Sequence, residues 1–229
     1  MCGRNGIFVG IWRTYQLELG SALSPKEAPT LDEATWVRRT ELSDGAWIEH
    51  RSGFVLGHQV LFDLLASRVN WRSEERVMYG RTVHTPRLVA GIEQAAALHP
   101  VLEAVRLWLS RQYGENFARV SAALYRDGRD SVANHGDTHA RDMEVAMVAT
   151  LTLGSTRRML LQPTEGKGSV SVSLSGGDLF VMGGTSQRTW RRGIPKVSHA
   201  GPRIAVMFRP VWTSVPSGGV EHDSARCSR

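Results

Sequence analysis

The chain has 229 residues, 41% of them hydrophobic, which is typical of one globular domain with a sizeable core. Its formal net charge of +6 favours a polyanionic partner such as nucleic acid, although its scattered arginines fit an arginine-rich proteome equally well. No apolar run is long enough to span a bilayer, so we expect no membrane association, and the two cysteines, Cys2 and Cys227, exclude a disulfide framework and favour the reducing cytoplasm.

The two ends of the chain are predicted to be flexible. Residues 1–30 are expected to form an N-terminal extension, because Ser21 to Thr30 contains two prolines and little periodicity. Residues 213–229 are polar, contain glycine and serine, and are expected to form a C-terminal tail. Residues 31–212 remain as one folded domain.

The first half of this domain is predicted to be helical. Apolar residues recur at helical spacing between Leu56 and Leu65, and this pattern ends near Asn70. A second helix is predicted to begin at Pro100 and end at Gly114, because proline fits the first helical turn and glycine fits the position after the last one.

From Val120 onward the chain is predicted to form short strands separated by Gly, Asp and Ser turns. The expected strands are 120–126, 145–153, 157–162, 170–174, 179–182 and 204–209. Six short strands at this spacing indicate a sandwich, jelly roll or barrel. Helices that precede such strands would cover one face of the sheet, so we expect an α+β fold that is mainly β.

A histidine and an aspartate, His135 and Asp137, lie two residues apart. On an extended segment both side chains point to the same side. An imidazole and a carboxylate on one side supply two of the three protein ligands of a 2-His-1-carboxylate iron site. Taken alone, such a pair is frequent by chance and is by default a hydrogen-bonded pair on the surface.

Two arginines share one side of the last predicted strand. Arg203 and Arg209 are separated by an even number of residues, and long arginine side chains that lean inward would grip a small dianion between them. Tyr125, at the end of the strand from Val120, places a hydroxyl that would hydrogen-bond a carboxylate. The alternatives are two solvated arginines and an aromatic residue at the end of a barrel.

An ordered set of motifs over about residues 40–212 resembles the bacterial AlkB-type Fe(II)/2-oxoglutarate dioxygenases. These motifs are Met78–Arg81, Pro86–Leu88, Leu124–Val132, His135–Asp137, Gly177–Gly184, Gln187–Trp190, Ile194–Lys196 and Gly201–Ile204. The resemblance implies a double-stranded β-helix, or jelly roll, with the N-terminal helices on one face. It also implies oxidative hydroxylation and dealkylation of alkylated nucleobases with Fe(II) and 2-oxoglutarate as cofactors.

Carried over by position, His135 and Asp137 match the first two iron ligands of the family. Arg203 and Arg209 match its 2-oxoglutarate-binding arginines, and Tyr125 matches a contact to that co-substrate.

The third iron ligand breaks this pattern, because Arg192 stands where the family has a histidine. A guanidinium has no acceptor lone pair and cannot ligate a metal. At about 4 Å from a dication it would be repelled by about 8 kcal/mol at an effective dielectric of 20. If Arg192 stays inside, its natural partner is Asp137, in a salt bridge at the iron position.

Other departures concern the substrate pocket. Ala123, Asn134, Gly91 and Ile92 replace residues that the family commonly has as Asn, Trp and aromatic side chains, so we expect a shifted substrate. His139 and His199 are the histidines nearest in sequence to the site, and either would bind iron only after local rearrangement.

Three functions therefore stay open, and the first two are enzymatic. The first is a divergent oxygenase acting on an alkylated nucleobase or a small specialised metabolite. The second is a metal-independent, redox-neutral enzyme, which uses Asp137 and Arg192 for proton transfer or cyclisation. The third is a non-catalytic nucleic-acid-binding protein. The sequence alone favours an enzyme of oxygenase ancestry, and leaves the substrate and the oligomeric state undetermined.

Overall fold

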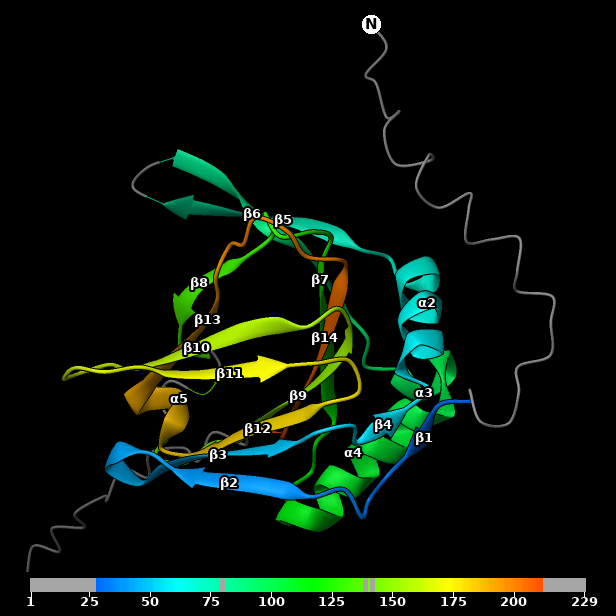
Figure 1. Cartoon of the computed structure of the whole chain (residues 1–229), viewed down its shortest axis with the longest axis horizontal. Coiled ribbons are helices and arrows are strands. Elements are labelled where there is room, and N and C mark those ends of the chain that lie inside the picture. The colour runs from blue at the N-terminus through cyan, green and yellow to red at the C-terminus, as the bar shows by residue number, and fades with distance from the viewer. Residues whose placement is uncertain (1–27, 79–80, 138–139, 141–142, 212–229) are drawn as a thin grey trace, which may run out of the picture.

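Two antiparallel sheets face each other in the computed structural model, which describes residues 28–78, 81–137, 140 and 143–211 (Figure 1). The larger sheet has the strand order β2-β3-β12-β9-β14-β7-β6-β5. Its strands are β2 (Val37–Glu41), β3 (Ala46–Arg51), β5 (Arg72–Met78), β6 (Arg81–Gly91), β7 (Arg119–Tyr125), β9 (Val148–Gly154), β12 (Leu179–Gly184) and β14 (Arg203–Arg209).

The smaller sheet has the order β11-β10-β13-β8. It is made of β8 (Val132–His135), β10 (Arg157–Pro163), β11 (Val170–Leu174) and β13 (Trp190–Ile194). A further pair of short strands is formed by β1 (Thr30–Leu31) and β4 (Val55–Leu56). This arrangement confirms the predicted fold, mainly β with large antiparallel sheets as in a jelly roll.

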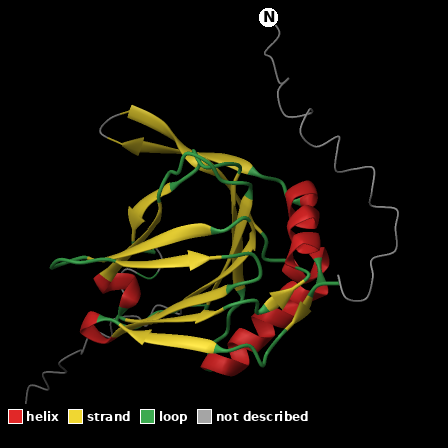
Figure 2. Cartoon of the chain, viewed as in Figure 1, coloured by secondary structure: helices red, strands yellow, loops and turns green. Residues whose placement is uncertain are grey.

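The long helices lie on the outer side of the larger sheet (Figure 2). They are α2 (His58–Arg68) and α4 (Pro100–Tyr113), and the shorter helical turns are η1 (Ser43–Gly45), α3 (Ala95–Leu98) and α5 (Ser186–Thr189). Helix α4 has the predicted ends: Pro100 occupies the first turn, and Gly114 follows the helix with φ 70°. None of the described helices is long and apolar enough to cross a membrane.

Two apolar cores separate the layers. The first joins α2 and α4 to the outer side of the larger sheet, through residues such as Leu61, Leu109 and Phe208. The second lies between the sheets and packs Met159 and Trp190 against Ala205. Because both sides of β14 are covered, its side chains that face the smaller sheet lie inside the molecule.

The two predicted helices are present as α2 and α4, but the first half is not helical throughout. The strands β2, β3, β5 and β6 lie there beside the helices, and the sequence pattern missed them because they lack a clean apolar alternation. Strand β5, for example, reads RSEERVM and forms the edge of the sheet, where one side of a strand faces solvent. It pairs with β6 through backbone hydrogen bonds.

Strands β8 and β13 were missed for the same reason, since VANH and WRRGI carry polar side chains. The strands predicted from Val120 onward are all present. The two predicted flexible ends fall largely on residues 1–27 and 212–229, which lie outside the described residues.

Candidate functional site

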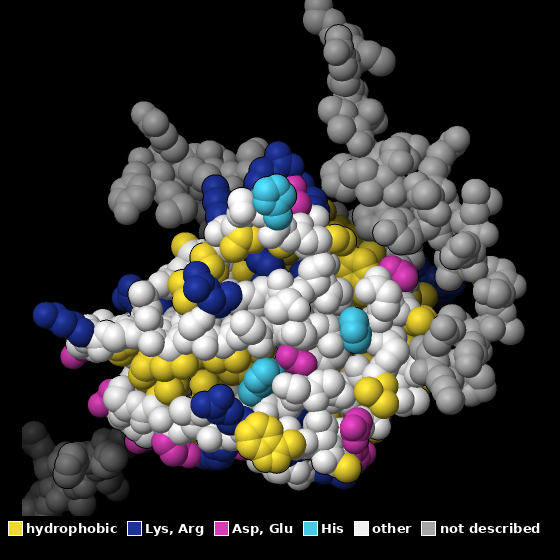
Figure 3. Space-filling model, in the orientation of Figure 1, with side chains coloured by type: hydrophobic (Ala, Val, Ile, Leu, Met, Phe, Trp, Pro, Cys, Tyr) yellow, Lys and Arg dark blue, Asp and Glu magenta, His cyan; other side chains and the backbone are white. Residues whose placement is uncertain are grey.

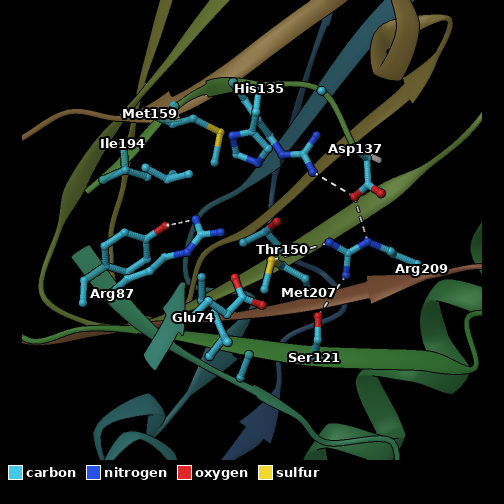
Figure 4. A pocket seen from close by; sticks show the side chains of 18 of the residues that line it. Glu74, Arg87, Ser121, His135, Asp137, Thr150, Met159, Ile194, Met207 and Arg209 are labelled. Atoms are coloured by element: carbon cyan, nitrogen blue, oxygen red, sulfur yellow. Dashed lines mark hydrogen bonds and ion pairs between the residues drawn. The ribbon is translucent and has the colours of Figure 1, made fainter. Parts of the chain in front are cut away.

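The candidate site is a cavity of about 1240 Å³ between the two sheets (Figure 4). The larger sheet supplies its floor from β7, β9 and β14, and the smaller sheet supplies its opposite wall from β8 and β13. The hairpin of β5 and β6, which projects from the sandwich in Figure 1, contributes Arg72, Glu74 and Arg87 to the rim. All six predicted site residues line this cavity: Tyr125, His135, Asp137, Arg192, Arg203 and Arg209.

Asp137 is held by two guanidinium groups. Its Oδ2 accepts from Nη2 of Arg192 at 3.1 Å and from Nε of Arg209 at 2.8 Å. Asp137 and Arg192 are both buried. The predicted salt bridge between Arg192 and Asp137 is therefore confirmed, while the second partner, Arg209, was not foreseen from the sequence.

Arg192 is fixed inside the sandwich from two directions. Backbone pairing of β13 with β8 sets it directly opposite His135, and its Nη1 donates to Oε1 of Gln187 at 2.6 Å. Burial lowers the pKa of Arg192, and the charge of Asp137 opposes this change. A guanidinium stays protonated in proteins, so the site contains a permanent buried cation.

The His135 ring is uncharged at neutral pH. Its Nδ1 donates to the backbone oxygen of Ala133 at 2.8 Å, which leaves Nε2 as the acceptor nitrogen. Burial, together with the positive charge of Arg192, lowers the pKa of His135 to about 4.

An iron ion does not fit this set of side chains. The oxygen of Asp137 that would ligate it accepts from two arginines, and the guanidinium of Arg192 lies beside Asp137, on the strand position opposite His135. Among the described residues there is no group of three or more His, Cys, Asp or Glu side chains that would hold a metal ion.

The two alternative histidines do not change this conclusion. His199 is exposed and lines a separate small hollow with Asp127 and Gly128. His139 lies outside the described residues.

A carboxylate, in contrast, fits the other end of the cavity. The side chain of Arg203 is 1% exposed, and its Nη2 donates to Oγ1 of Thr152 at 3.1 Å. Its Nε and Nη1 are buried and have no hydrogen-bond partner among the described residues. The guanidinium carbon lies 5.3 Å from the centre of the Tyr125 ring. Because a buried cation with unpaired donors is costly, an anion is the natural complement of Arg203.

Two further arginines surround Tyr125. Arg87, which the sequence motifs included without a role, donates from Nη1 to the Tyr125 hydroxyl at 3.4 Å. Arg157 is buried and donates to the backbone oxygens of Asp127, Asp130 and Pro195, so it ties β10 to two loops. Nothing in the sequence pattern indicated Arg157, because its partners are backbone atoms.

The substituted pocket positions fall into two groups. Asn134 and Gly91 line the cavity, and Asn134 donates to Gln162 on β10. Ala123 stands on the same side of β7 as Tyr125 and belongs to the core between the sheets. Ile92 packs instead in the core beneath the helices. The expected change of the pocket therefore rests on Asn134, Gly91 and Ala123, and not on Ile92.

The lining of the cavity is strongly cationic. Among the described residues it contains two carboxylates, Glu74 and Asp137, against seven arginines: Arg72, Arg87, Arg188, Arg191, Arg192, Arg203 and Arg209. With His135 uncharged, these groups carry a net charge of +5. Such a lining attracts anionic ligands and repels divalent cations.

Comparison with known proteins agrees with the fold. The family model described as the 2OG-Fe(II) oxygenase superfamily matches residues 32–225. The bovine "Alpha-ketoglutarate-dependent dioxygenase alkB homolog 3" is 28% identical over 174 residues, which cover 66% of this chain and 61% of that protein. The bovine "DNA oxidative demethylase ALKBH2" is 26% identical over 121 residues, which cover 49% and 44%.

The solved structure of OsALKBH1 superposes with a TM-score of 0.49 at 12% identity, over 76% of this chain and all of that one. The match to the alkB homolog 3 proteins spans about three fifths of the length of those proteins. Because the family model covers most of its length, the chain belongs to the 2OG-Fe(II) oxygenase superfamily, as an AlkB-like member.

Proposed function

We propose that this chain is a metal-independent AlkB-like protein that binds a modified nucleobase within DNA and performs no iron-dependent oxidation. The observation that carries this proposal is the buried Arg192, ion-paired to Asp137 at the place of the third iron ligand. An iron ion about 4 Å from this guanidinium would be repelled by about 8 kcal/mol at an effective dielectric of 20. This repulsion is comparable to the binding free energy of many metal sites.

The nucleic-acid part of the proposal rests on the rim of the cavity. Arg72, Arg188 and Arg191 are exposed there, on three different elements, and surround the entrance with positive charge. Arginines in this arrangement suit the phosphates on either side of a base that enters the cavity. The name of the ALKBH2 relative, a DNA oxidative demethylase, supports DNA as the polymer.

The size of the cavity also suits this ligand. About 1240 Å³ exceeds the usual volume of a small-molecule pocket and accommodates a base together with a second, smaller ligand. Asn134 at the entrance offers an amide that hydrogen-bonds base edges.

Metal independence is tested on the wild-type protein. Calorimetric titration with Mn(II) or anaerobic Fe(II) is expected to show no stoichiometric binding, and addition of iron and 2-oxoglutarate is expected to yield no succinate. Stoichiometric metal together with succinate formation would overturn the proposal. If the protein converts an added modified base and a chelator does not stop the reaction, the protein is metal-independent and is a redox-neutral enzyme.

DNA binding is tested by fluorescence anisotropy with methylated and unmethylated oligonucleotides at several salt concentrations. Replacing Arg72, Arg188 and Arg191 by alanine is expected to reduce the slope of log K against log salt by about 2–3, since each phosphate contact contributes about 0.9. The matched control replaces three exposed arginines away from the cavity, Arg38, Arg68 and Arg158, and removes the same charge. Equal losses in both triple variants, or no binding at low salt, would exclude a DNA site at this rim.

A further inference from the structure

A shallow trough runs along β14 on the floor of the cavity, from Arg203 to Arg209. The strand positions between them that face the cavity are Ala205 and Met207. Backbone pairing sets Ala205 between Ala123 and Thr152, and sets Met207 between Ser121 and Thr150. Apart from Met207, these side chains are short, so they leave space between the two arginines.

The two guanidinium groups lean toward each other along this trough. Arg203 donates to Thr152, and Thr152 is paired with Ala205, two residues further along β14. Arg209 donates from Nη1 to Oγ of Ser121 at 2.9 Å, and Ser121 is paired with Met207, two residues before Arg209 on β14. The guanidinium groups therefore lie over neighbouring rows of the sheet, two residues or about 7 Å apart along the strand.

Each end of the trough has one positive charge in excess. At one end, Arg203 has two buried donors that have no hydrogen-bond partner among the described residues, and it forms no ion pair with a described carboxylate. At the other end, Arg192 and Arg209 share the single carboxylate of Asp137. On the hairpin side of the cavity the charge of Arg87 is offset by Glu74, and the remaining arginine, Arg72, is exposed at the rim outside the trough. The interior thus matches a ligand with two negative charges.

We infer that this trough binds a short linear dicarboxylate directly on arginines, with the guanidinium of Arg192 in the place of a metal ion, so that a 2-oxo group is not required. This inference rests on the metal independence proposed above, and names the second ligand of the same cavity.

The chemical difference between a metal and a guanidinium decides the selectivity. A metal ion chelates a 2-oxo acid through its keto and carboxylate oxygens together, and therefore distinguishes it from a plain carboxylate. A guanidinium binds the two oxygens of one carboxylate through a planar pair of N–H donors, and the keto oxygen adds little. Glutarate, which has the length of 2-oxoglutarate and lacks the keto group, becomes an equivalent ligand.

The test is calorimetry with EDTA present throughout, using 2-oxoglutarate, glutarate and the monocarboxylate butyrate. Glutarate and 2-oxoglutarate are expected to bind within about threefold of each other, and butyrate at least about tenfold more weakly, because one charge pair is lost. These ligand comparisons use the wild-type protein and do not depend on how any variant folds.

Variants assign the contacts. Arg192→Gln and Arg203→Gln are each expected to weaken glutarate at least about tenfold. Arg158→Gln is the matched control, because Arg158 is exposed on β10 and does not line the cavity, and its glutarate affinity is expected to stay within about twofold. Thermal melting of each variant shows that it is folded.

The failures of the two proposals are distinguishable. If 2-oxoglutarate binds only after a divalent metal is added and glutarate never binds, both this inference and metal independence are wrong. If no dicarboxylate binds with or without metal, while the protein still binds DNA and no metal, only this inference is wrong. Equal glutarate affinity in wild type and in Arg192→Gln would remove Arg192 from the site.

Discussion

Replacing Arg192 by histidine is expected to create a metal site together with His135 and Asp137. The structure places position 192 opposite His135 and in contact with Asp137, so a histidine there would complete a set of two imidazoles and one carboxylate. The substitution also removes a cation whose repulsion of a dication is about 8 kcal/mol at 4 Å. Relief of even about 2 kcal/mol corresponds to about a thirtyfold change in metal Kd.

The expected affinity of Arg192→His for Co(II) or Mn(II) lies in the micromolar range. It is not expected to be tighter, because Arg209 still donates to the Asp137 oxygen that would ligate the metal. Calorimetry and the visible absorption of bound Co(II) measure the binding directly, so the assay needs no substrate. The control is Arg192→Leu, which removes the charge without adding a ligand and is expected to bind at least about tenfold more weakly than the histidine variant.

Two outcomes would refute this reasoning. If Arg192→His is folded and binds no more metal than the wild type, the guanidinium is not what keeps metal out. If Arg192→Leu binds as tightly as Arg192→His, charge alone decides and position 192 does not face the metal.

Two stability predictions follow from other buried carboxylates. Asp137→Asn removes the negative charge that Arg192 and Arg209 share, and is expected to lower the free energy of unfolding by about 3–5 kcal/mol in urea titrations; a loss below about 1 kcal/mol would contradict a buried ion-pair cluster. Burial alone would raise the pKa of Asp178, but hydrogen bonds from His50 and backbone N–H groups outweigh it and lower the pKa. The stability that Asp178 contributes is therefore complete above its unfolded pKa of about 4, and it is lost as pH falls through the lower folded pKa. In the variant Asp178→Asn the melting temperature is expected to depend less on pH below about pH 4. An acid dependence equal to that of the wild type would contradict this.

The sequence predicted those elements whose local signals and tertiary environment agree. Helix α4 has a proline in its first turn and a glycine after its end, and the structure has both boundaries. Strand β9 reads VATLTLG and is buried on both sides, so its apolar run was recognisable. Strand β5 carries four charged residues in seven, and only its backbone pairing to β6 makes it a strand.

The site was predictable to the extent that its chemistry is local. Spacing alone set Arg203 and Arg209 on one side of a strand, and the missing lone pair of Arg192 predicted its ion pair with Asp137. The roles of Gln187 and Thr152 were not predictable, because they come from other strands and turns. Sequence separation carries no information about which distant side chain supplies the next hydrogen bond.

The polar interior of this sandwich indicates a ligand site rather than the remnant of an iron centre. Buried ion pairs are often replaced by apolar side chains at no cost or with a gain in stability, so a pocket without a ligand has no physical reason to hold excess charge. Here Arg203 keeps two buried donors without partners, and Asp137 alone serves Arg192 and Arg209. A small apolar residue at position 192 would leave Asp137 and Arg209 neutral as a pair. The arginine at position 192 adds one buried positive charge, and an anionic ligand would offset the free-energy cost of burying it.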